Sequence, residues 1–274
     1  MFHKLLKTVF ALGAIAFFLG GCSEYQEVLR SDDINLKYEA SERLYNAGKY
    51  KKSLGVMEQI VPAFRGRPQA EKLMFMYAST FYNLKDYLLA GYQFERFTET
   101  YPKSDSAQVA AYRSAKSYYH ESPRFSLDQK DTYKAIEKLQ AFINQYPASP
   151  YRTQANALVA ELNGKLELKA IGIAQQNLKI GAYLNDYRPA ITSFENFIID
   201  HPGSVYRKDA YYGRLRAAYL LAINSRPALQ KQRLVQAQNA HKSFLKYFAK
   251  SELRGAADKM AQDINERLAL QPTS

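Results

Sequence analysis

The sequence predicts an all-α protein, a solenoid of about five divergent helix-turn-helix repeats closed by a C-terminal capping helix. Two observations predict it: an aromatic motif returns at helical spacing, and no run alternates apolar and polar residues between hairpin turns as strands do. The motif is clearest at Tyr87, Ala90, Phe94 and Phe97, followed by Pro102. Spacings of three and four residues place these side chains on one helical face, and proline, which has no N–H, ends the helix.

The same pattern returns along the chain, which indicates tandem repeats. The second clear copy is Tyr187, Ala190, Phe194, Phe197 and Pro202. Looser copies are Tyr50, Ser53, Met57 and Ile60; Thr132, Ala135, Leu139, Phe142 and Pro147; and Ala237, His241 and Phe244, with Ala249 in the place of proline. The small residue of each copy lets the preceding helix approach closely, and the large residues fill the groove between neighbouring repeats. Stacked helix pairs of this kind bury a continuous core.

Each motif helix is expected to have a partner helix before it. Residues 36–47 and 70–84 are the partners in the first two repeats, with Gly48 at the first turn. This organisation resembles the tetratricopeptide (TPR) repeat, a helix-turn-helix unit of about 34 residues. We therefore assign residues 36–105 to repeats 1 and 2 and residues 106–250 to repeats 3 to 5.

The later repeats carry insertions and irregular segments. Residues 122–129 and 225–227 are predicted loops, and residues 152–185, which hold no proline, are predicted to form one long helix that could bend at a glycine. The C-terminal region 251–274 is predicted to hold the capping helix, from Ser251 to Leu270, and a short tail. Its apolar residues share one side, as a solenoid cap requires: Leu253, Ala257, Met260, Ile264 and Leu268.

The N-terminus has the form of an export signal. Lys4 and Lys7 precede an apolar run over residues 8–19, and the run ends at Gly20-Gly21-Cys22. An apolar run of about 12 residues is short for a membrane-spanning helix, which needs ~20. The cysteine directly after the small residues resembles a bacterial lipoprotein signal. That resemblance implies that residues 1–21 are removed and that the thiol of Cys22 carries a diacylglycerol and fatty chains such as palmitate. Residues 22–35 would then be an extended, lipidated linker.

Composition limits the classes of partner. The formal net charge is +12 and the sequence pI is about 9.5, which in a cytoplasmic protein would suggest nucleic acid. The export signal argues against nucleic acid and favours anionic lipid headgroups or an acidic protein face, although a merely solvated basic surface remains an alternative. Cys22 is the one cysteine, so no internal disulfide can form.

No set of residues has the pattern of a catalytic site or of a metal-binding site. His201 and His241 fall at repeat positions that packing residues occupy elsewhere, and His120 pairs with no second ligand at metal spacing. The chain has no Gly-rich phosphate loop and no nucleophile elbow, and Asp32-Asp33 is too short for a calcium loop. We therefore expect a protein that is not an enzyme, with no metal and no cofactor other than the lipid on Cys22.

A binding surface is the expected functional feature. A solenoid of this kind presents a groove lined mainly by the first helix of each repeat, and tyrosine and arginine are typical of binding hot spots. The peptide-binding candidates in the first two repeats are Tyr38, Arg43, Tyr45, Lys72, Tyr77 and Tyr82. The alternative is that these tyrosines belong to the core.

Several phrases in fixed order point to a family. They are Leu19-Gly20-Gly21-Cys22; Tyr45-Asn46-Ala47-Gly48-Lys49-Tyr50; and Phe94-x-x-Phe97-x-x-x-Tyr101-Pro102-x-Ser104, which returns over residues 142–149 and 197–204. The segment from Ser122-Pro123 to Asp128-Gln129, followed by Ala135-Ile136, also resembles the third repeat of that family. Over nearly the whole chain the sequence resembles the BamD family of outer-membrane assembly lipoproteins.

The resemblance implies a role in the β-barrel assembly machine that consists of binding and involves no catalysis. Members of the family sit on the periplasmic face of the outer membrane, bind the POTRA domains of the central barrel protein BamA, and are implicated in receiving unfolded outer-membrane protein precursors. By analogy, the first repeats would receive precursors and the later repeats would dock BamA. The docking candidates rest on this region alone: Arg188, Arg207, Arg214 and Arg216.

Two further points bear on the location and the partner. The residue after the lipidated cysteine is Ser23, where an Asp would retain a lipoprotein at the inner membrane in well-studied sorting systems, so export to the outer membrane is allowed. The leading alternative is another envelope TPR lipoprotein, a scaffold for pilus or secretin assembly or a cell-wall-associated protein. That alternative shares the tether and the fold and differs in partner.

Overall fold

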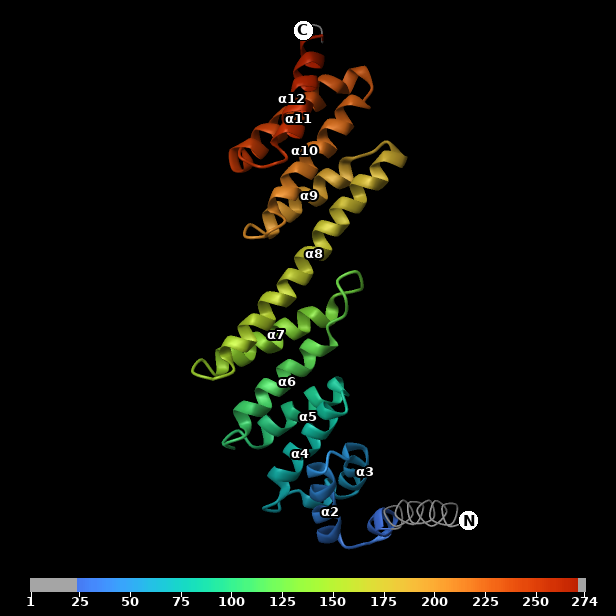
Figure 1. Cartoon of the computed structure of the whole chain (residues 1–274), viewed down its shortest axis with the longest axis vertical. Helices are drawn as coiled ribbons and strands as arrows, with labels where there is room; N and C mark the ends of the chain where they lie inside the picture. Colours follow the sequence, from blue (N-terminus) through green and yellow to red (C-terminus); the bar gives the residue numbers. More distant parts are fainter. Residues whose placement is uncertain (1–23, 271–274) are drawn as a thin grey trace, which may run out of the picture. The chain divides into compact units, whose positions relative to one another are not determined.

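The structure is a computed structural model that describes residues 24–270 (Figure 1). These residues form helices and connecting loops, with no strand among them. No helix in this part of the chain is both long enough and apolar enough to span a bilayer. The predicted signal peptide, the lipidation site Cys22 and the last four residues lie outside the described residues.

The helices follow one another with short connections. In chain order they are α2 (Ile34–Asn46), α3 (Tyr50–Ile60), the 3₁₀ turn η1 (Pro62–Phe64), α4 (Ala70–Asn83), α5 (Tyr87–Thr100), α6 (Ala107–Glu121), α7 (Lys130–Gln145), α8 (Arg152–Leu184), α9 (Arg188–Asp200), α10 (Arg207–Ile223), α11 (Pro227–Phe248) and α12 (Arg254–Ala269). Residues 24–30 are helical as well. The predicted all-α, TPR-like solenoid is confirmed, as are the single long helix α8 and the loop over residues 122–129. The loop predicted over residues 225–227 ends at Arg226, because Pro227 is the first residue of α11.

Contacts divide the chain into two compact units. Unit 1 holds the described residues through Pro123 together with Gln129–Val159, and unit 2 holds Arg124–Asp128 and the residues from Ala160 onward. The boundary falls inside α8, whose first turns belong to unit 1. The assignment of precursors to residues 36–105 and of BamA to residues 106–250 concerns partners and stays a prediction.

The core of unit 1 is built from the repeat motif. In α5, Ala90, Phe94 and Phe97 are fully buried, and the first helix of the next repeat, α6, packs on this helix. The copies in α3 and α7 also turn their motif residues inward: Ser53, Met57 and Ile60, and Thr132, Ala135, Leu139 and Phe142. The packing role predicted for the motif is therefore confirmed in all of unit 1.

Local chemistry starts and stops these helices. The Asp33 carboxylate accepts hydrogen bonds from the backbone N–H of Asn35 at 2.8 Å and of Leu36 at 3.3 Å, so it caps α2. Gly48, at φ 70°, supplies the left-handed residue that turns the chain from α2 into α3. In α5, α7 and α9 the helix ends two residues before proline, as predicted.

Unit 2 repeats the scheme and adds the cap. In α9, Ala190, Phe194 and Phe197 are buried, and in α11 Ala237 and Phe244 are buried. The capping helix α12 buries Ala257 and Ile264 against α10 and α11, while the outer members of its apolar side are partly buried. The predicted cap is confirmed, although the helix begins at Arg254 rather than at Ser251.

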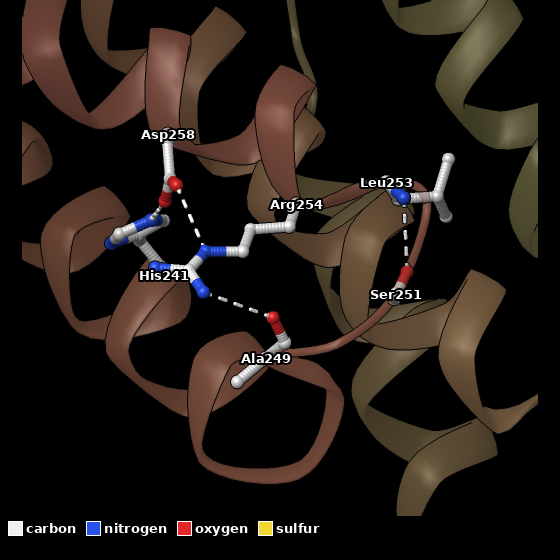
Figure 2. A network of polar contacts seen from close by, with 6 residues as sticks. All are labelled: His241, Ala249, Ser251, Leu253, Arg254 and Asp258. Atoms are coloured by element: carbon white, nitrogen blue, oxygen red, sulfur yellow. Dashed lines mark hydrogen bonds and ion pairs between the residues drawn. The ribbon is translucent and has the colours of Figure 1, made fainter.

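Polar contacts join α11 to α12 (Figure 2). The Asp258 carboxylate lies 2.9 Å from His241 Nε2 and accepts a hydrogen bond from Arg254 Nε at 3.2 Å. The Ser251 hydroxyl accepts a hydrogen bond from the backbone N–H of Leu253 at 3.0 Å, at the turn that leads into α12. His241 thus replaces an apolar packing residue of the motif with a polar contact to the cap.

The prediction of an extended N-terminal linker is wrong for the described residues. Residues 22–35 were expected to be extended, but residues 24–30 form a helix and α2 already begins at Ile34. Val28 is 6% exposed and packs with Ala40 and Val56, so the short helix covers the first repeat. Burial of one apolar side against α2 and α3 stabilises a helix that is too short to form alone.

Candidate functional site

The first helices of the repeats in unit 1 lie side by side. Lys72 on α4 forms an ion pair with Glu42 on α2. Arg113 on α6 donates a hydrogen bond to the Ser79 hydroxyl on α4 at 3.1 Å. Tyr112 on α6 donates a hydrogen bond to Gln154, in the first turn of α8, at 2.9 Å. We call the surface formed by α2, α4, α6 and this first turn of α8 the first-helix face.

A cleft of about 370 Å³ opens on the first-helix face at the start of α4. It is lined by Pro68, Glu71, Lys72, Phe75, Phe97 and Ser106. The Phe75 ring meets the rings of Phe94 and Phe97 edge-on, with centroids 5.8 Å and 5.4 Å away, and the Arg113 guanidinium lies 5.5 Å from its centroid. The cleft therefore has an aromatic floor, one cation, Lys72, and one acid, Glu71, while Arg113 lies over the Phe75 ring without lining the cleft.

The candidate tyrosines of the first repeats are half-buried. The Tyr38 ring stacks on Phe64 with centroids 5.3 Å apart, and the Tyr77 ring meets Phe81 at 4.9 Å. Burial raises the pKa of Tyr38 and of Tyr77 above the usual phenol value. Together with Tyr45, these rings pack around the cluster of Met57, Ile60 and Phe64. One side of each ring belongs to the core, which leaves the other edge for a ligand.

Tyr82 belongs to a separate aromatic cluster at the other end of α4. Its hydroxyl lies 3.4 Å from His120 Nε2, and the His120 ring stacks on Tyr87 at a centroid distance of 4.2 Å. Burial, and then the nearby Lys116 charge, lower the pKa of His120, so the ring is neutral at neutral pH. In the described chain, no group of three or more His, Cys, Asp and Glu side chains could hold a metal ion.

Arg43 lies apart from the other candidates. It donates a hydrogen bond to Glu24 of the N-terminal helix at 2.6 Å, and it lines a small cleft with Tyr25, Lys49 and Lys52. Tyr38 and Tyr45, seven residues apart, lie on the side of α2 that packs with the residues of α4. The structure therefore gathers Tyr38, Tyr45, Lys72 and Tyr77 between α2 and α4. Tyr82 lies with the cluster at the other end of α4, and Arg43 of α2 turns to the N-terminal helix.

A cleft in unit 2 has a volume of about 600 Å³, and we call it the large cleft of unit 2. Its walls come from α8, the start of α9, α10 and the residue before α12: Gln175, Leu178, Lys179, Ala182, Tyr183, Tyr187, Phe194, Asp209, Tyr212, Gly213, Arg216, Leu220 and Leu253. At its rim Tyr183 is 91% exposed and the adjacent Leu184 is 71% exposed. Lys179 and Arg216 have no ion-pair partner in the described part of the chain, so the cleft is apolar with two free cations and one acid, Asp209.

The other docking candidates do not share this cleft. Arg207 and Arg214 flank the Tyr211 ring at 5.4 Å and 5.5 Å, and Arg207 also lies 4.8 Å from the Tyr247 centroid. In both, the Nε atom is buried without a hydrogen-bond partner in the described residues. Positions 207, 211 and 214 share one helical face, while position 216 lies about 200° from position 214. The two sides of α10 therefore carry different arginines.

Arg188 is engaged at the start of α9. It donates hydrogen bonds from Nε and Nη2 to the two carboxylate oxygens of Asp186 at 2.9 Å and 2.8 Å. These bonds, with one from the Arg188 backbone N–H, lower the pKa of Asp186 to about 2. This pair organises the α8–α9 turn, and of the four predicted docking arginines Arg216 alone lies in the large cleft of unit 2.

Comparison with known proteins gives the family. A family model described as "YfiO: Outer membrane lipoprotein" matches residues 31–185, more than half of the chain. The chain belongs to the YfiO family of outer membrane lipoproteins. A curated relative, the "Outer membrane protein assembly factor BamD" of Caulobacter vibrioides (strain ATCC 19089 / CIP 103742 / CB 15), is 29% identical over 186 residues. This stretch is 65% of the present chain and 59% of the relative, so the chain spans about three-fifths of the length of that relative. The resemblance to the BamD-type lipoproteins is confirmed.

The YfiO match covers the two clefts unequally. Residues 31–185 include the whole first-helix face and the α8 wall of the unit 2 cleft, with Lys179 and Tyr183. The match stops before α9, so Arg188, Arg207, Arg214 and Arg216 lie outside it. Family membership therefore supports the first-helix face more directly than it supports the arginine-bearing wall.

Sequence reasoning missed three residues that shape these surfaces. Phe75 and Arg113 were not singled out, yet Phe75 lines the cleft at the start of α4 and the Arg113 guanidinium lies over the Phe75 ring. Tyr183 was not singled out either, because residues 152–185 show no repeat motif. A signal existed for Arg113: it stands on the first helix of the third repeat, the same kind of helix that supplied the other candidates.

Proposed function

We propose that this chain is the lipid-anchored, periplasmic TPR component of the outer-membrane β-barrel assembly machine. It binds unfolded barrel precursors and the POTRA domains of BamA and promotes folding and insertion without chemistry of its own. Membership in the YfiO family and the name of the Caulobacter relative support this proposal. The lipoprotein-type signal ending at Cys22 supports attachment by a lipid to the periplasmic face of the outer membrane.

The first-helix face is the observation that carries the precursor part of the proposal. It offers half-buried tyrosines, the Phe75 floor and the cations Lys72 and Arg113 over three neighbouring helices. An unfolded barrel strand offers alternating aromatic residues and unpaired backbone groups. Ring edges and guanidinium groups can bind such aromatics weakly at many registers. Weak binding suits a carrier, since it raises the local concentration of the precursor and hinders edge-to-edge aggregation while permitting release.

We assign BamA docking to the large cleft of unit 2. A folded domain that inserts an apolar residue beside an acidic one would match its apolar wall and the free charges of Lys179 and Arg216. The exposed ring of Tyr183, which lines the cleft, is of the type that forms the centre of an interface. Arg207 and Arg214 are already engaged with Tyr211, so we expect a smaller contribution from them.

The first experiment is crosslinking in intact cells, followed by purification of the chain and identification of its partners. Near-stoichiometric recovery of a barrel protein with POTRA domains is the expected result. Recovery of pilus, secretin or cell-wall components without such a barrel would replace the proposal by the alternative envelope scaffold. Labelling with radioactive palmitate, compared between the native chain and Cys22→Ser, tests the anchor separately.

A pair of charge-reversed variants tests the division between the two surfaces. Lys72→Glu/Arg113→Glu is expected to weaken precursor binding at least tenfold and to keep BamA, whereas Lys179→Glu/Arg216→Glu is expected to do the reverse. The matched control is Lys242→Glu/Lys259→Glu, because both lysines are exposed and line neither cleft. Circular dichroism checks that each variant is folded. If the first-helix variant is folded and loses BamA, the division is wrong.

A further inference from the structure

The N-terminal helix fixes the start of the described chain to the first repeat. Val28 is buried against Ala40 and Val56, and Glu24 accepts a hydrogen bond from Arg43 at 2.6 Å. The Lys52 ammonium lies 5.1 Å from the centroid of the Tyr25 ring. A Cβ at Gly55 would stand 3.0 Å from the Tyr25 hydroxyl, so the ring lies close to the backbone of α3. Residues 24–30 are therefore a packed part of repeat 1 and not a free linker.

Because the helix is packed, only a very short connection separates it from the proposed lipid on Cys22. Cys22 precedes Glu24 by two residues, and two residues of fully extended chain span at most about 7 Å. A lipid on Cys22 would therefore hold the Glu24 end of the helix within a headgroup's reach of the bilayer surface. This step rests on the proposed lipid anchor.

The same end of repeat 1 is basic. Arg43, Lys49 and Lys52 line a cleft of about 160 Å³ together with Glu24 and Tyr25, and Lys51 is exposed beside them. The acidic groups of the short helix are Glu24, which is paired with Arg43, and Glu27. Lys49 and Lys51 have no ion-pair partner among the described residues. We call Lys49, Lys51 and Lys52 the lysine corner.

We propose that the lysine corner is a membrane-contact surface that binds the phosphates of anionic lipid headgroups beside the anchor. Two independent features point to this occupant: the short distance to Cys22 and the complementary charge. A basic group near an anionic surface strengthens partitioning about fivefold, so the corner adds to the lipid anchor and limits the orientations that repeat 1 can adopt. The anchor then holds the first repeat in a fixed orientation relative to the membrane instead of on a flexible tether.

Vesicle flotation tests the surface apart from the lipid. The probe is the mature chain, residues 22–274 with Cys22→Ser, mixed with phosphatidylcholine vesicles that contain or lack phosphatidylglycerol. We expect binding to the anionic vesicles only, loss of binding at high salt, and about 25-fold weaker binding for Lys49→Gln/Lys51→Gln, at about fivefold for each lysine. The matched control is Lys250→Gln/Lys259→Gln, which removes the same charge from exposed positions outside the corner. Equal weakening by both double variants, or no preference for anionic vesicles, would overturn the proposal.

A second measurement uses the lipidated chain. Cys22 is the one native cysteine, so a cysteine introduced elsewhere can be labelled with a fluorophore once Cys22 carries its lipid. Headgroup-attached nitroxide lipids should quench a label at Lys51→Cys strongly and a label at Gln59→Cys weakly, because position 59 is about 12 Å further along α3. Equal quenching at both positions would contradict a fixed orientation of the first repeat relative to the membrane.

The outcomes separate this inference from the proposed function. Absence of palmitate on Cys22 would refute the anchor, whatever the vesicles show. A lipidated protein whose corner variant floats normally but loses a protein partner in cells would show that the lysine corner binds an acidic protein, and the membrane-contact proposal would be wrong.

Discussion

Gly213 decides how closely α10 approaches α9. A Cβ at this position would stand 2.3 Å from Cζ of Phe194, whose ring is 1% exposed, so the ring or the backbone would have to shift. We therefore predict that Gly213→Ala destabilises unit 2 by about 1–3 kcal/mol, because overpacking outweighs the better helix propensity of alanine. Urea unfolding followed by circular dichroism measures the change.

Gly172→Ala is the matched control for this substitution. Gly172 lies inside α8, and a Cβ there would have no neighbour within 4 Å. The alanine should stabilise the chain by up to about 1 kcal/mol, from helix propensity alone. A shift of both variants in the same direction would show that close packing at Gly213 is not the deciding factor.

Asp258 gives the α11–α12 junction a dependence on pH. The contact with His241, and then those with Arg254, lower the pKa of the Asp258 carboxyl (Figure 2). A carboxyl whose pKa is lower in the folded chain stabilises the fold above its unfolded pKa of about 3.9, and the stabilisation is lost as pH falls. Asp258→Asn should therefore lower the Tm at pH 7 and have a smaller effect below about pH 4. Thermal scans over this range measure it, and a Tm difference that is independent of pH would contradict the assignment.

At the scale of single elements, the helix of residues 24–30 depends on its packing. We predict that Val28→Ala costs about 1.5 kcal/mol for the two methyl-sized groups removed from a buried site. Because the helix is short, this loss should appear first as faster amide exchange over residues 24–30. Val205→Ala, at a position 83% exposed, is the control and should leave exchange unchanged. Equal exchange in the two variants would show that Val28 does not hold the helix.

The same helix shows where prediction from sequence ends. Repeat motifs predicted α3, α5, α7, α9 and α11, because each buries a face with helical periodicity that can be read without a partner. Residues 24–30 carry a short apolar side of Tyr25, Val28 and Leu29, in which Val28 alone is fully buried, so their helix depends on the surface of α2 and α3, which the sequence does not display. Arg214 and Arg216 could have been separated in advance, since positions two apart lie on opposite sides of a helix. Arg43 could not, because its partner Glu24 belongs to the missed helix.

At the scale of the whole molecule, the repeats carry two separate surfaces on two compact units. In a solenoid each repeat contacts its neighbours only, so stability is a sum of local terms and a local defect spreads over a limited distance. The first-helix face lies in unit 1, and the cleft with Lys179 and Arg216 lies in unit 2. Partner binding at one surface is therefore expected to stabilise the repeats beneath it more than the rest of the chain.

Two equivalent core substitutions test this local coupling. Phe94 and Phe194 occupy the same motif position in α5 and α9, and both are buried. Each change to alanine should cost about 3–5 kcal/mol, since it leaves a cavity the size of a ring. Hydrogen exchange should then quicken mainly over α4 to α6 for Phe94→Ala and mainly over α9 to α11 for Phe194→Ala, so that each variant is the control for the other. If either variant quickens exchange evenly along the chain, the repeats unfold as one cooperative body, and the two proposed binding surfaces cannot be stabilised independently.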